Sequence, residues 1–402
     1  MIRRGVRVGS RSCMLLLASV LGFSLSLASE PASEVSLTIA AAPQHPLIEV
    51  RDTQQLLNFD FAVRNNGKST LRLTEIEVSV YDFAQELVVR KTVNSNGLSP
   101  SVGIVAQPLL GPGEIADVFN PFYSFAEDLP LDRLEYAFRY VREDDAQERE
   151  ANRHRLPLDF DVEVHTSVIP QRYSTKTELI LPLTERLFIW EGHDFYAHHR
   201  RVPLNAPKVM GMGLSANSNR YAFDFEVLDA RARMYHDDAY KKGNWYCYGA
   251  FVYAPGAGKV IAAENDIPDN WYEGKRVVHP ELPANVDPRD LGNYVLIDHG
   301  DGEYSILNHM MPGSVVVKSG DVVRQGQLIG RIGFSGDTIF PHLHYSLISG
   351  PEVYKVEGLP AYFSNYRRFL GAKSVDIKRG AVDSGDILQS KANYSKPNAT
   401  KP

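Results

Sequence analysis

Residues 292–346 read GNYVLIDHGDGEYSILNHMMPGSVVVKSGDVVRQGQLIGRIGFSGDTIFPHLHYS, and this stretch decides the fold. Runs of apolar and β-branched residues at 294–298, 304–307 and 314–318 have the length of short strands. Turns that contain glycine separate these runs, at 300–302, 319–321 and 335–337. Strands joined by such turns are typical of antiparallel sheets. The stretch therefore predicts a compact antiparallel β unit.

Histidines gather at the end of this stretch. His342 and His344 follow Pro341, which is expected to mark the start of a strand. Alternate residues of a strand point to the same face, so both histidines can face one groove. His309 lies a strand and a turn earlier in the chain. The spacing suits a metal ligand beside a proton-transfer group, and it predicts half of a zinc site.

The order of these motifs resembles that of the lysostaphin or LytM-type zinc metallopeptidases. Their domain ends in Gly-Asn-Tyr-Val, an Asn/Ala-His pair, a Gly-Asp-x-Val-x-x-Gly-Gln-x-Ile-Gly run and Pro-His-Leu-His. The corresponding residues here are 292–295, 308–309, 320–330 and 341–344. Upstream, the hairpin VYAPGAGKVI at residues 252–261 is also similar to one in the family. The resemblance covers roughly residues 185–350.

The resemblance also assigns an aspartate ligand, but the first histidine ligand departs from the family pattern. Asp224, in NRYAFDF, matches the family's aspartate, while the position four residues earlier holds Arg220, which cannot bind zinc. The nearest upstream histidines are His198 and His199, so we interpret residues 202–216 as an insertion. Adjacent residues on a strand point to opposite faces, so only one of the two enters the site. The sequence leaves open which one.

The resemblance implies the roles of these residues. Asp224, His344 and one of the paired histidines would hold Zn²⁺ and leave a fourth position open, as in catalytic zinc sites. His309 and His342 would be the catalytic histidines that do not bind the metal. The implied activity is hydrolysis of peptide cross-links in bacterial peptidoglycan. The loops at 202–216 and 265–290 are expected to shape the groove, with Trp271 and Tyr272 in the second loop.

Two alternatives remain at this point. Arg220 in place of a histidine favours a catalytically inactive module that binds cell wall or activates another wall hydrolase. Residues 317–330 also resemble the turn of biotinyl and lipoyl carrier domains, although the context of a modified lysine is missing. A bound metal would favour the peptidase over both.

The rest of the chain predicts an exported, all-β protein of two domains. Residues 1–28 carry four arginines followed by an apolar run, which indicates a secretory signal peptide and a location in the periplasm, cell envelope or extracellular space. We expect an immunoglobulin-like β-sandwich at 36–170, a LytM-type metallopeptidase domain at 175–371 and a disordered tail at 372–402. The sandwich is a candidate binding unit for a wall-assembly protein. No membrane span is expected after removal of the signal.

Composition narrows the classes of partner. The formal net charge is −6 and becomes more negative without the arginines of the leader, so the chain is not expected to bind nucleic acid. Hydrophobic residues make up 44% of the chain and charged residues 23%, values that suit a soluble protein with a buried core. Cys13 leaves with the leader, so Cys247 is expected to have no disulfide partner.

Overall fold

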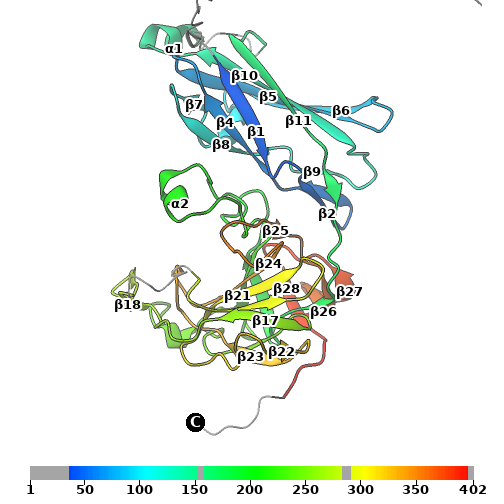
Figure 1. Cartoon of the computed structure of the whole chain (residues 1–402), viewed down its shortest axis with the longest axis vertical. Coiled ribbons are helices and arrows are strands. Elements are labelled where there is room, and N and C mark those ends of the chain that lie inside the picture. Colours follow the sequence, from blue (N-terminus) through cyan, green and yellow to red (C-terminus); the bar gives the residue numbers. More distant parts are fainter. Residues whose placement is uncertain (1–35, 153–154, 156–157, 283–290, 397–402) are drawn as a thin grey trace, which may run out of the picture.

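The computed structural model describes residues 36–152, 155, 158–282 and 291–396. Regular structure within these ranges is almost entirely strand, which confirms the predicted all-β class. Figure 1 shows two β domains joined by a linker, with the N-terminal domain above the C-terminal domain. The predicted signal peptide lies outside the described residues. Among the described residues, no helix has the length and apolarity that crossing a membrane requires.

The N-terminal domain is built from two sheets that share one core. One sheet has the order β1-β4-β8, and the other has the order β11-β10-β5-β6 with β7 paired to β5. Phe61 of β4 packs against Tyr136 and Phe138 of β10, at ring centroid distances of 4.8 and 5.1 Å. Two sheets around one core are the architecture of a β-sandwich. Its assignment to the immunoglobulin class stays a prediction.

The bounds of the N-terminal elements are as follows. The sandwich strands are β1 (Leu37–Ala42), β4 (Asp60–Asn65), β5 (Leu71–Tyr81), β6 (Leu87–Asn94), β7 (Leu109–Leu110), β8 (Ile115–Phe119), β10 (Arg133–Arg142) and β11 (Val162–Val168). A third sheet, of order β12-β2-β3-β9, comprises β2 (Leu47–Arg51), β3 (Gln54–Leu57), β9 (Ser124–Ala126) and β12 (Gln171–Arg172). The short helices are η1 (Ser101–Ile104) and α1 (Ala146–Asn152).

One large sheet organises the C-terminal domain, and its order is β13-β26-β28-β14-β15-β24-β21-β20-β17-β22. Its strands are β13 (Leu179–Ile180), β14 (Arg186–Glu191), β15 (Phe223–Val227), β17 (Gly258–Ala263), β20 (Asn293–Asp298), β21 (Tyr304–Met310), β22 (Val322–Val323), β24 (Leu343–Ile348), β26 (Phe363–Leu370) and β28 (Ile387–Ser390). β25 (Gly358–Leu359) pairs with β24, and β27 (Lys373–Gly380) pairs with β26. Outside this sheet lie β16 (Phe251–Tyr253), β18 (Trp271–Glu273), β19 (Arg276–Val278), β23 (Leu328–Arg331), α2 (Pro207–Gly211) and η2 (Lys242–Asn244).

The predicted disordered tail is wrong for residues 372–396. β27 and β28 occupy part of this range, and β28 pairs with both β14 and β26 inside the large sheet. Val382 and Leu388 are fully buried. The polar composition of the tail led to the wrong prediction. A strand that pairs with a neighbour on both sides, as β28 does, needs few apolar residues of its own. Residues 397–402 lie outside the described range.

Residues 314–318 were also predicted as a strand, and the structure places no strand there. Their backbone N–H groups bond to separate partners instead of a strand ladder. The N–H of Val315 donates to Asn265 Oδ1 at 2.9 Å, and that of Lys318 donates to Asp321 Oδ2 at 3.0 Å. The β-branched run is not part of a sheet, and composition by itself does not distinguish such a run from a strand.

The linker between the domains is fixed by one buried carboxylate. Glu303 accepts hydrogen bonds from the Tyr173 hydroxyl at 2.5 Å and from the backbone N–H groups of Lys176 and Thr177, each at 2.7 Å. The Thr177 hydroxyl donates a fourth at 2.6 Å. Burial would raise the pKa of Glu303, but these hydrogen bonds hold it below the usual 4.5. The linker is therefore anchored to an ionised group.

Replacing Glu303 by glutamine is expected to lower the free energy of unfolding at pH 7 by about 1–3 kcal/mol. The reason is that the NH2 group of glutamine would face hydrogen-bond donors that now bond to a carboxylate oxygen. Because the pKa of Glu303 is lower in the folded state than the unfolded-state value of 4.5, the ionised carboxylate stabilises the fold at pH values above 4.5. That stabilisation is lost as pH falls through the folded-state pKa. Urea denaturation of both proteins between pH 7 and pH 3 measures the difference, which should shrink below about pH 4.5. If the difference in free energy of unfolding stayed constant over this pH range, the proposed anchoring by ionised Glu303 would be contradicted.

Candidate metal centre

Strand register brings the predicted aspartate opposite the predicted histidine. β15 pairs with β24 so that Asp224 faces His344, and Asn308 of β21 pairs with His344 from the other side. The large apolar neighbours on β15, Phe223 and Phe225, are fully buried in the core. The His344 Nδ1 atom lies 3.0 Å from Asp224 Oδ1. The alternation of β24 therefore directs the His344 side chain toward Asp224.

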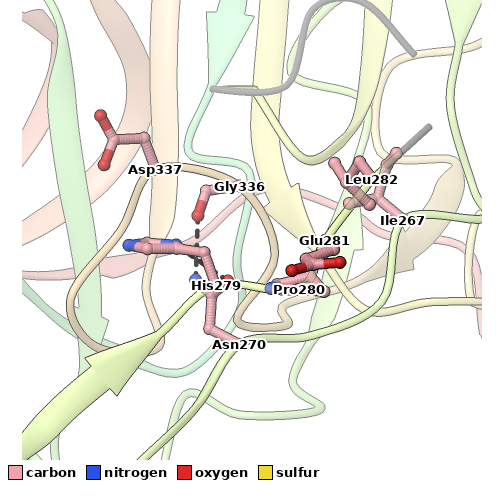
Figure 2. Close-up of a pocket in the computed structure, with 8 residues that line it drawn as sticks. All are labelled: Ile267, Asn270, His279, Pro280, Glu281, Leu282, Gly336 and Asp337. Atoms are coloured by element: carbon pink, nitrogen blue, oxygen red, sulfur yellow. Dashed lines mark hydrogen bonds between the residues drawn. The ribbon is translucent and has the colours of Figure 1, made fainter. Parts of the chain in front are cut away.

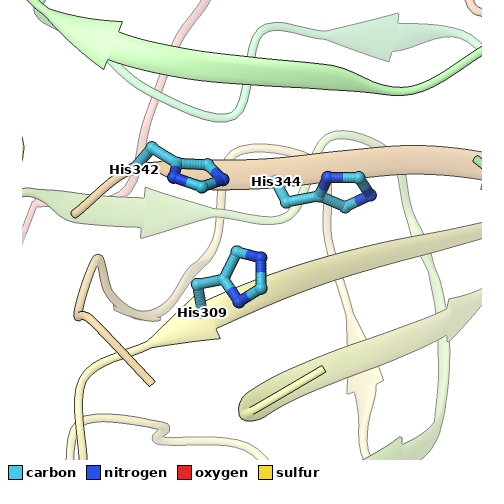
Figure 3. Close-up of side chains that lie close together, drawn as sticks. All are labelled: His309, His342 and His344. Carbon is cyan, nitrogen blue, oxygen red and sulfur yellow. The ribbon is translucent and has the colours of Figure 1, made fainter. Parts of the chain in front are cut away.

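A bulge turns His309 toward the same place. Between the pairs Asn293↔Met310 and Val295↔Leu307, two residues of β21 stand opposite one residue of β20. His309 itself has a φ of 61°, in the left-handed region that non-glycine residues rarely adopt. Bulges of this kind redirect a side chain out of the regular alternation. Figure 3 shows the His309 ring directed toward His342 and His344, and its centroid lies 4.9 Å from that of His342.

The structure separates the paired histidines that the sequence left open. His199 is 1% exposed, and its Nδ1–H donates to the Gly192 carbonyl at 2.9 Å. This leaves His199 Nε2 as the free ring nitrogen, 3.3 Å from Asp224 Oδ1. The His198 side chain is 63% exposed and pairs with Glu191 at 2.6 Å. Of the two, His199 is the one whose ring nitrogen reaches the aspartate.

Three imidazole nitrogens converge on one carboxylate oxygen. His199 Nε2, His342 Nε2 and His344 Nδ1 lie 3.3, 3.2 and 3.0 Å from Asp224 Oδ1. In a tetrahedral zinc site with bonds of about 2.0–2.1 Å, neighbouring ligand atoms are about 3.3 Å apart. The gap and the chemistry of these donors therefore fit a zinc ion. Among the described residues, the two other nearby histidines, His198 and His309, make no contact with Asp224 Oδ1 within 3.3 Å.

Electrostatics favours a charged carboxylate beside neutral imidazoles at His309 and His344. Burial would lower the pKa of His199, but Asp224 raises it above its usual value. Burial would raise the pKa of Asp224, but His199 and His342 hold it well below its usual value. Burial and the neighbouring His342 and His344 lower the pKa of His309 well below its usual range. Burial also lowers the pKa of His344, to about 4, against the opposing effect of Asp224. Neutral imidazole and ionised carboxylate are the forms that bind zinc.

The centre opens into a cavity of about 460 Å³. The five histidines and Asp224 lie on its wall together with side chains of the predicted insertion at 202–216. Val202, Val209, Met212 and Leu214 are the insertion residues that line it. The predicted insertion therefore lines the cavity at the centre. Trp190 and Phe340 also line the cavity, and their rings pack edge to face with centroids 4.8 Å apart.

The second predicted groove loop lines a different cavity. Residues of 265–282 surround a space of about 490 Å³ that Figure 2 shows beside the turn at Gly336 and Asp337. His279 Nδ1 lies 3.1 Å from Asn270 Oδ1, and the Asn270 amide donates to the Gly336 carbonyl at 2.9 Å. Asp337 borders both cavities, so the two adjoin. Residues 283–290 of this loop lie outside the described range.

Two further buried groups lie near the centre. Cys247 is fully buried, and its thiol donates to the Pro341 carbonyl at 3.1 Å. Glu226 of β15 is also fully buried. Burial raises the pKa of Glu226 well above its usual value. His236 lies outside the centre, exposed and paired with Asp237 at 2.8 Å.

Arg220, which replaces the familiar first ligand, has a structural partner in the other domain. Its guanidinium is 1% exposed and bonds to Asp60 of β4 at 2.6 Å and to Glu357 at 2.7 Å. The carbonyl of Arg220 accepts a hydrogen bond from Asn58 at 2.6 Å. The arginine at this position therefore joins the two domains. Sequence patterns gave no signal for this contact, because the partners are 160 residues apart in the chain.

Comparison with known proteins identifies the family of one part of the chain. Residues 246–354 match peptidase family M23. Peptidoglycan DD-endopeptidase ShyA of Vibrio cholerae is 44% identical over 100 residues, 25% of this chain and 18% of ShyA. ShyC of the same organism is 40% identical over 57 residues, 14% of this chain and 13% of ShyC. The matches thus span less than a fifth of either relative.

A solved zinc-containing peptidase from Vibrio cholerae shares 13% identity, covering 77% of this chain and 83% of that chain, with a TM-score of 0.23. The family match contains His309, His342 and His344, whereas His199 and Asp224 lie before its first residue. The motifs from Gly292 to His344 had indicated the same family. Residues 246–354 of this chain form a domain of peptidase family M23, the LytM type.

Proposed function

We propose that this protein is an exported zinc metallo-endopeptidase that hydrolyses peptide cross-links of bacterial peptidoglycan. The observation that carries the proposal is the convergence of His199 Nε2 and His344 Nδ1 on Asp224 Oδ1, within 3.3 Å, on the wall of an open cavity. The names of the two curated relatives, both peptidoglycan DD-endopeptidases, support this substrate class.

His199, Asp224 and His344 are the proposed zinc ligands. Three protein ligands leave one position open, which is the pattern of catalytic rather than structural zinc sites. When bound there, zinc supplies a Lewis acid that polarises the scissile carbonyl and lowers the pKa of water. The Gly192 carbonyl holds the His199 ring through Nδ1, the kind of outer contact that orients ligand imidazoles.

His309 and His342 are the proposed proton-transfer pair. The Nδ1–H of His309 donates to the Ser335 carbonyl at 2.8 Å, and that of His342 to the Phe340 carbonyl at 3.1 Å. Each ring is thereby fixed with Nε2 as its open acceptor. One of the two would take a proton from the attacking water, and the other would stabilise the oxyanion or protonate the leaving amine.

The arrangement of Arg220 weakens the case for an inactive module. That alternative rested on the absence of a histidine at position 220. Arg220 instead forms a buried ion pair with Asp60, and His199 reaches the aspartate from the upstream segment. Export, for which the signal-like residues 1–28 are the support, stays part of the proposal because peptidoglycan lies outside the cytoplasmic membrane.

Incubation of the chain without residues 1–28 with purified cross-linked muropeptide dimers tests the proposal. We expect monomers as products, separated by chromatography and identified by mass spectrometry. A chelator should stop their formation and added Zn²⁺ should restore it, because the proposed ligands hold a single ion. Intact dimers in the presence of protein that retains zinc would contradict the proposed activity.

A further inference from the structure

The segment that carries His199 belongs to no strand. Residues 192–201 consist of turns and bends between β14 and the insertion with α2. The Asn217 amide donates to the His199 carbonyl at 2.9 Å and to the Arg200 carbonyl at 3.3 Å. No strand ladder fixes this segment, so the position of the first proposed ligand depends on contacts made by side chains.

Arg200, the next residue, reaches from this segment into the N-terminal sandwich. Its Nη2–H donates to the Asn120 carbonyl at 2.9 Å, and the side chain is 1% exposed. The guanidinium lies 4.8 Å from the ring centroid of Phe195 and 5.4 Å from that of Tyr123. Those two rings stack across the interface, with centroids 5.0 Å apart and planes inclined by 16°. One buried arginine thus joins the ligand segment to the sandwich.

Further contacts of the segment go to the same domain. Arg201 lies over the ring of Phe119 at 4.9 Å, and Asn205 donates to the Asp117 carboxylate through its backbone and its amide, at 3.0 and 2.6 Å. His193 bonds to Glu49 of β2 at 2.9 Å. In Figure 1 the loop with α2 lies between the two domains. Residues of the N-terminal domain therefore contact the ligand segment both before and after His199.

We propose that the N-terminal sandwich completes the metal centre, with Arg200 and Tyr123 as the positioning residues that hold His199 at its place. The inference rests on the proposed zinc site and adds a task for the N-terminal domain. Ligand atoms must be held within about 0.2 Å to bind zinc well, so a loosened segment lowers zinc affinity without removal of a ligand. Residues that orient ligands typically contribute 10–100-fold to metal affinity.

Zinc affinity of the full chain without residues 1–28 tests the inference through three variants. Arg200→Met removes the hydrogen bond to Asn120 while keeping most of the volume, and Tyr123→Leu removes the stack from the sandwich side. Tyr362→Phe is the matched control, because the Tyr362 hydroxyl bonds to the backbone of Val50 in the N-terminal domain, at 2.9 and 3.0 Å, and forms no hydrogen bond with residues 193–201. Competition with a chelator of known affinity gives each zinc dissociation constant. The absorption spectrum of the Co²⁺-loaded protein reports ligand geometry.

The expected result is zinc binding about 10–100-fold weaker in Arg200→Met and Tyr123→Leu, with an altered Co²⁺ spectrum, and a change within about twofold in the control. Arg200→Lys, which keeps the charge, should recover part of the affinity. If Arg200→Met fails to unfold cooperatively on heating, the half-buried Tyr123 decides the question.

Three outcomes would overturn the positioning role. They are unchanged zinc dissociation constants in folded Arg200→Met or Tyr123→Leu, an equal loss in Tyr362→Phe, and an unaltered Co²⁺ spectrum despite weaker binding. A wild-type chain that binds no zinc would instead remove the proposed function itself. Wild-type binding that is insensitive to these variants leaves the proposed function standing and refutes only the role of the sandwich.

Discussion

Replacing His199 by alanine is expected to remove zinc from the protein and to lower turnover of cross-linked muropeptides by at least about 100-fold. Residues that merely orient a zinc ligand contribute 10–100-fold, so the loss of a ligand should exceed that range. His199 is buried, and its free Nε2 lies 3.3 Å from Asp224 Oδ1. Elemental analysis of zinc per chain and a cleavage assay on the same preparation measure both effects.

His198 provides the matched control for this prediction. It is adjacent in sequence, yet its side chain is 63% exposed and pairs with Glu191. His198→Ala should retain about one zinc per chain. A protein that keeps its zinc without His199 but loses it without His198 would reverse the assignment. Equal retention by both variants would exclude the segment from the metal centre.

The second large effect is expected from the proposed proton-transfer pair. His309→Ala and His342→Ala should each lower kcat by about 10²–10⁴-fold, the usual contribution of a positioned acid or base, with zinc still bound. Zinc content and kcat of the same preparation separate a ligand from a proton-transfer group. His344→Ala is the contrasting variant, because it should lose both.

Of these two variants, His342→Ala is the stricter test of the proposed roles. The His342 Nε2 atom lies 3.2 Å from Asp224 Oδ1, close enough to act as a fourth ligand beside His199 and His344. Four protein ligands would close the site and make it structural. Loss of zinc from His342→Ala would therefore contradict the proposed division of roles and the proposed catalysis. His309 differs from His342, because among the described residues the ring nitrogens that approach Asp224 belong to His199, His342 and His344.

The parts of the centre that sequence predicted are those that depend on local spacing. Alternation after Pro341 places His342 and His344 on one side of β24, and the Asp224 strand lies next to it in register. His309 was found through its motif, although alternation does not explain its direction. The bulge and the φ of 61° do so, and neither has a clear signature in the residues themselves.

The choice between His198 and His199 required the tertiary structure. Adjacent residues of a strand point to opposite faces, but this rule did not apply to His198 and His199, because residues 193–202 form no strand. His199 is selected by the Gly192 carbonyl and by contacts of Arg200 with a domain about 80 residues away in the chain. The tail was missed for a related reason, since β28 is held by pairing with β14 and β26 rather than by its own composition.

The most direct test is a crystal structure of the zinc-loaded protein with anomalous diffraction data at the zinc absorption edge. The account predicts one zinc ion bonded to His199 Nε2, an Asp224 oxygen and His344 Nδ1, with the fourth position open to the cavity and His309 and His342 outside the coordination sphere. An ion bonded to His198 in place of His199, an ion with His342 as a fourth protein ligand, or no ion at this centre would contradict it.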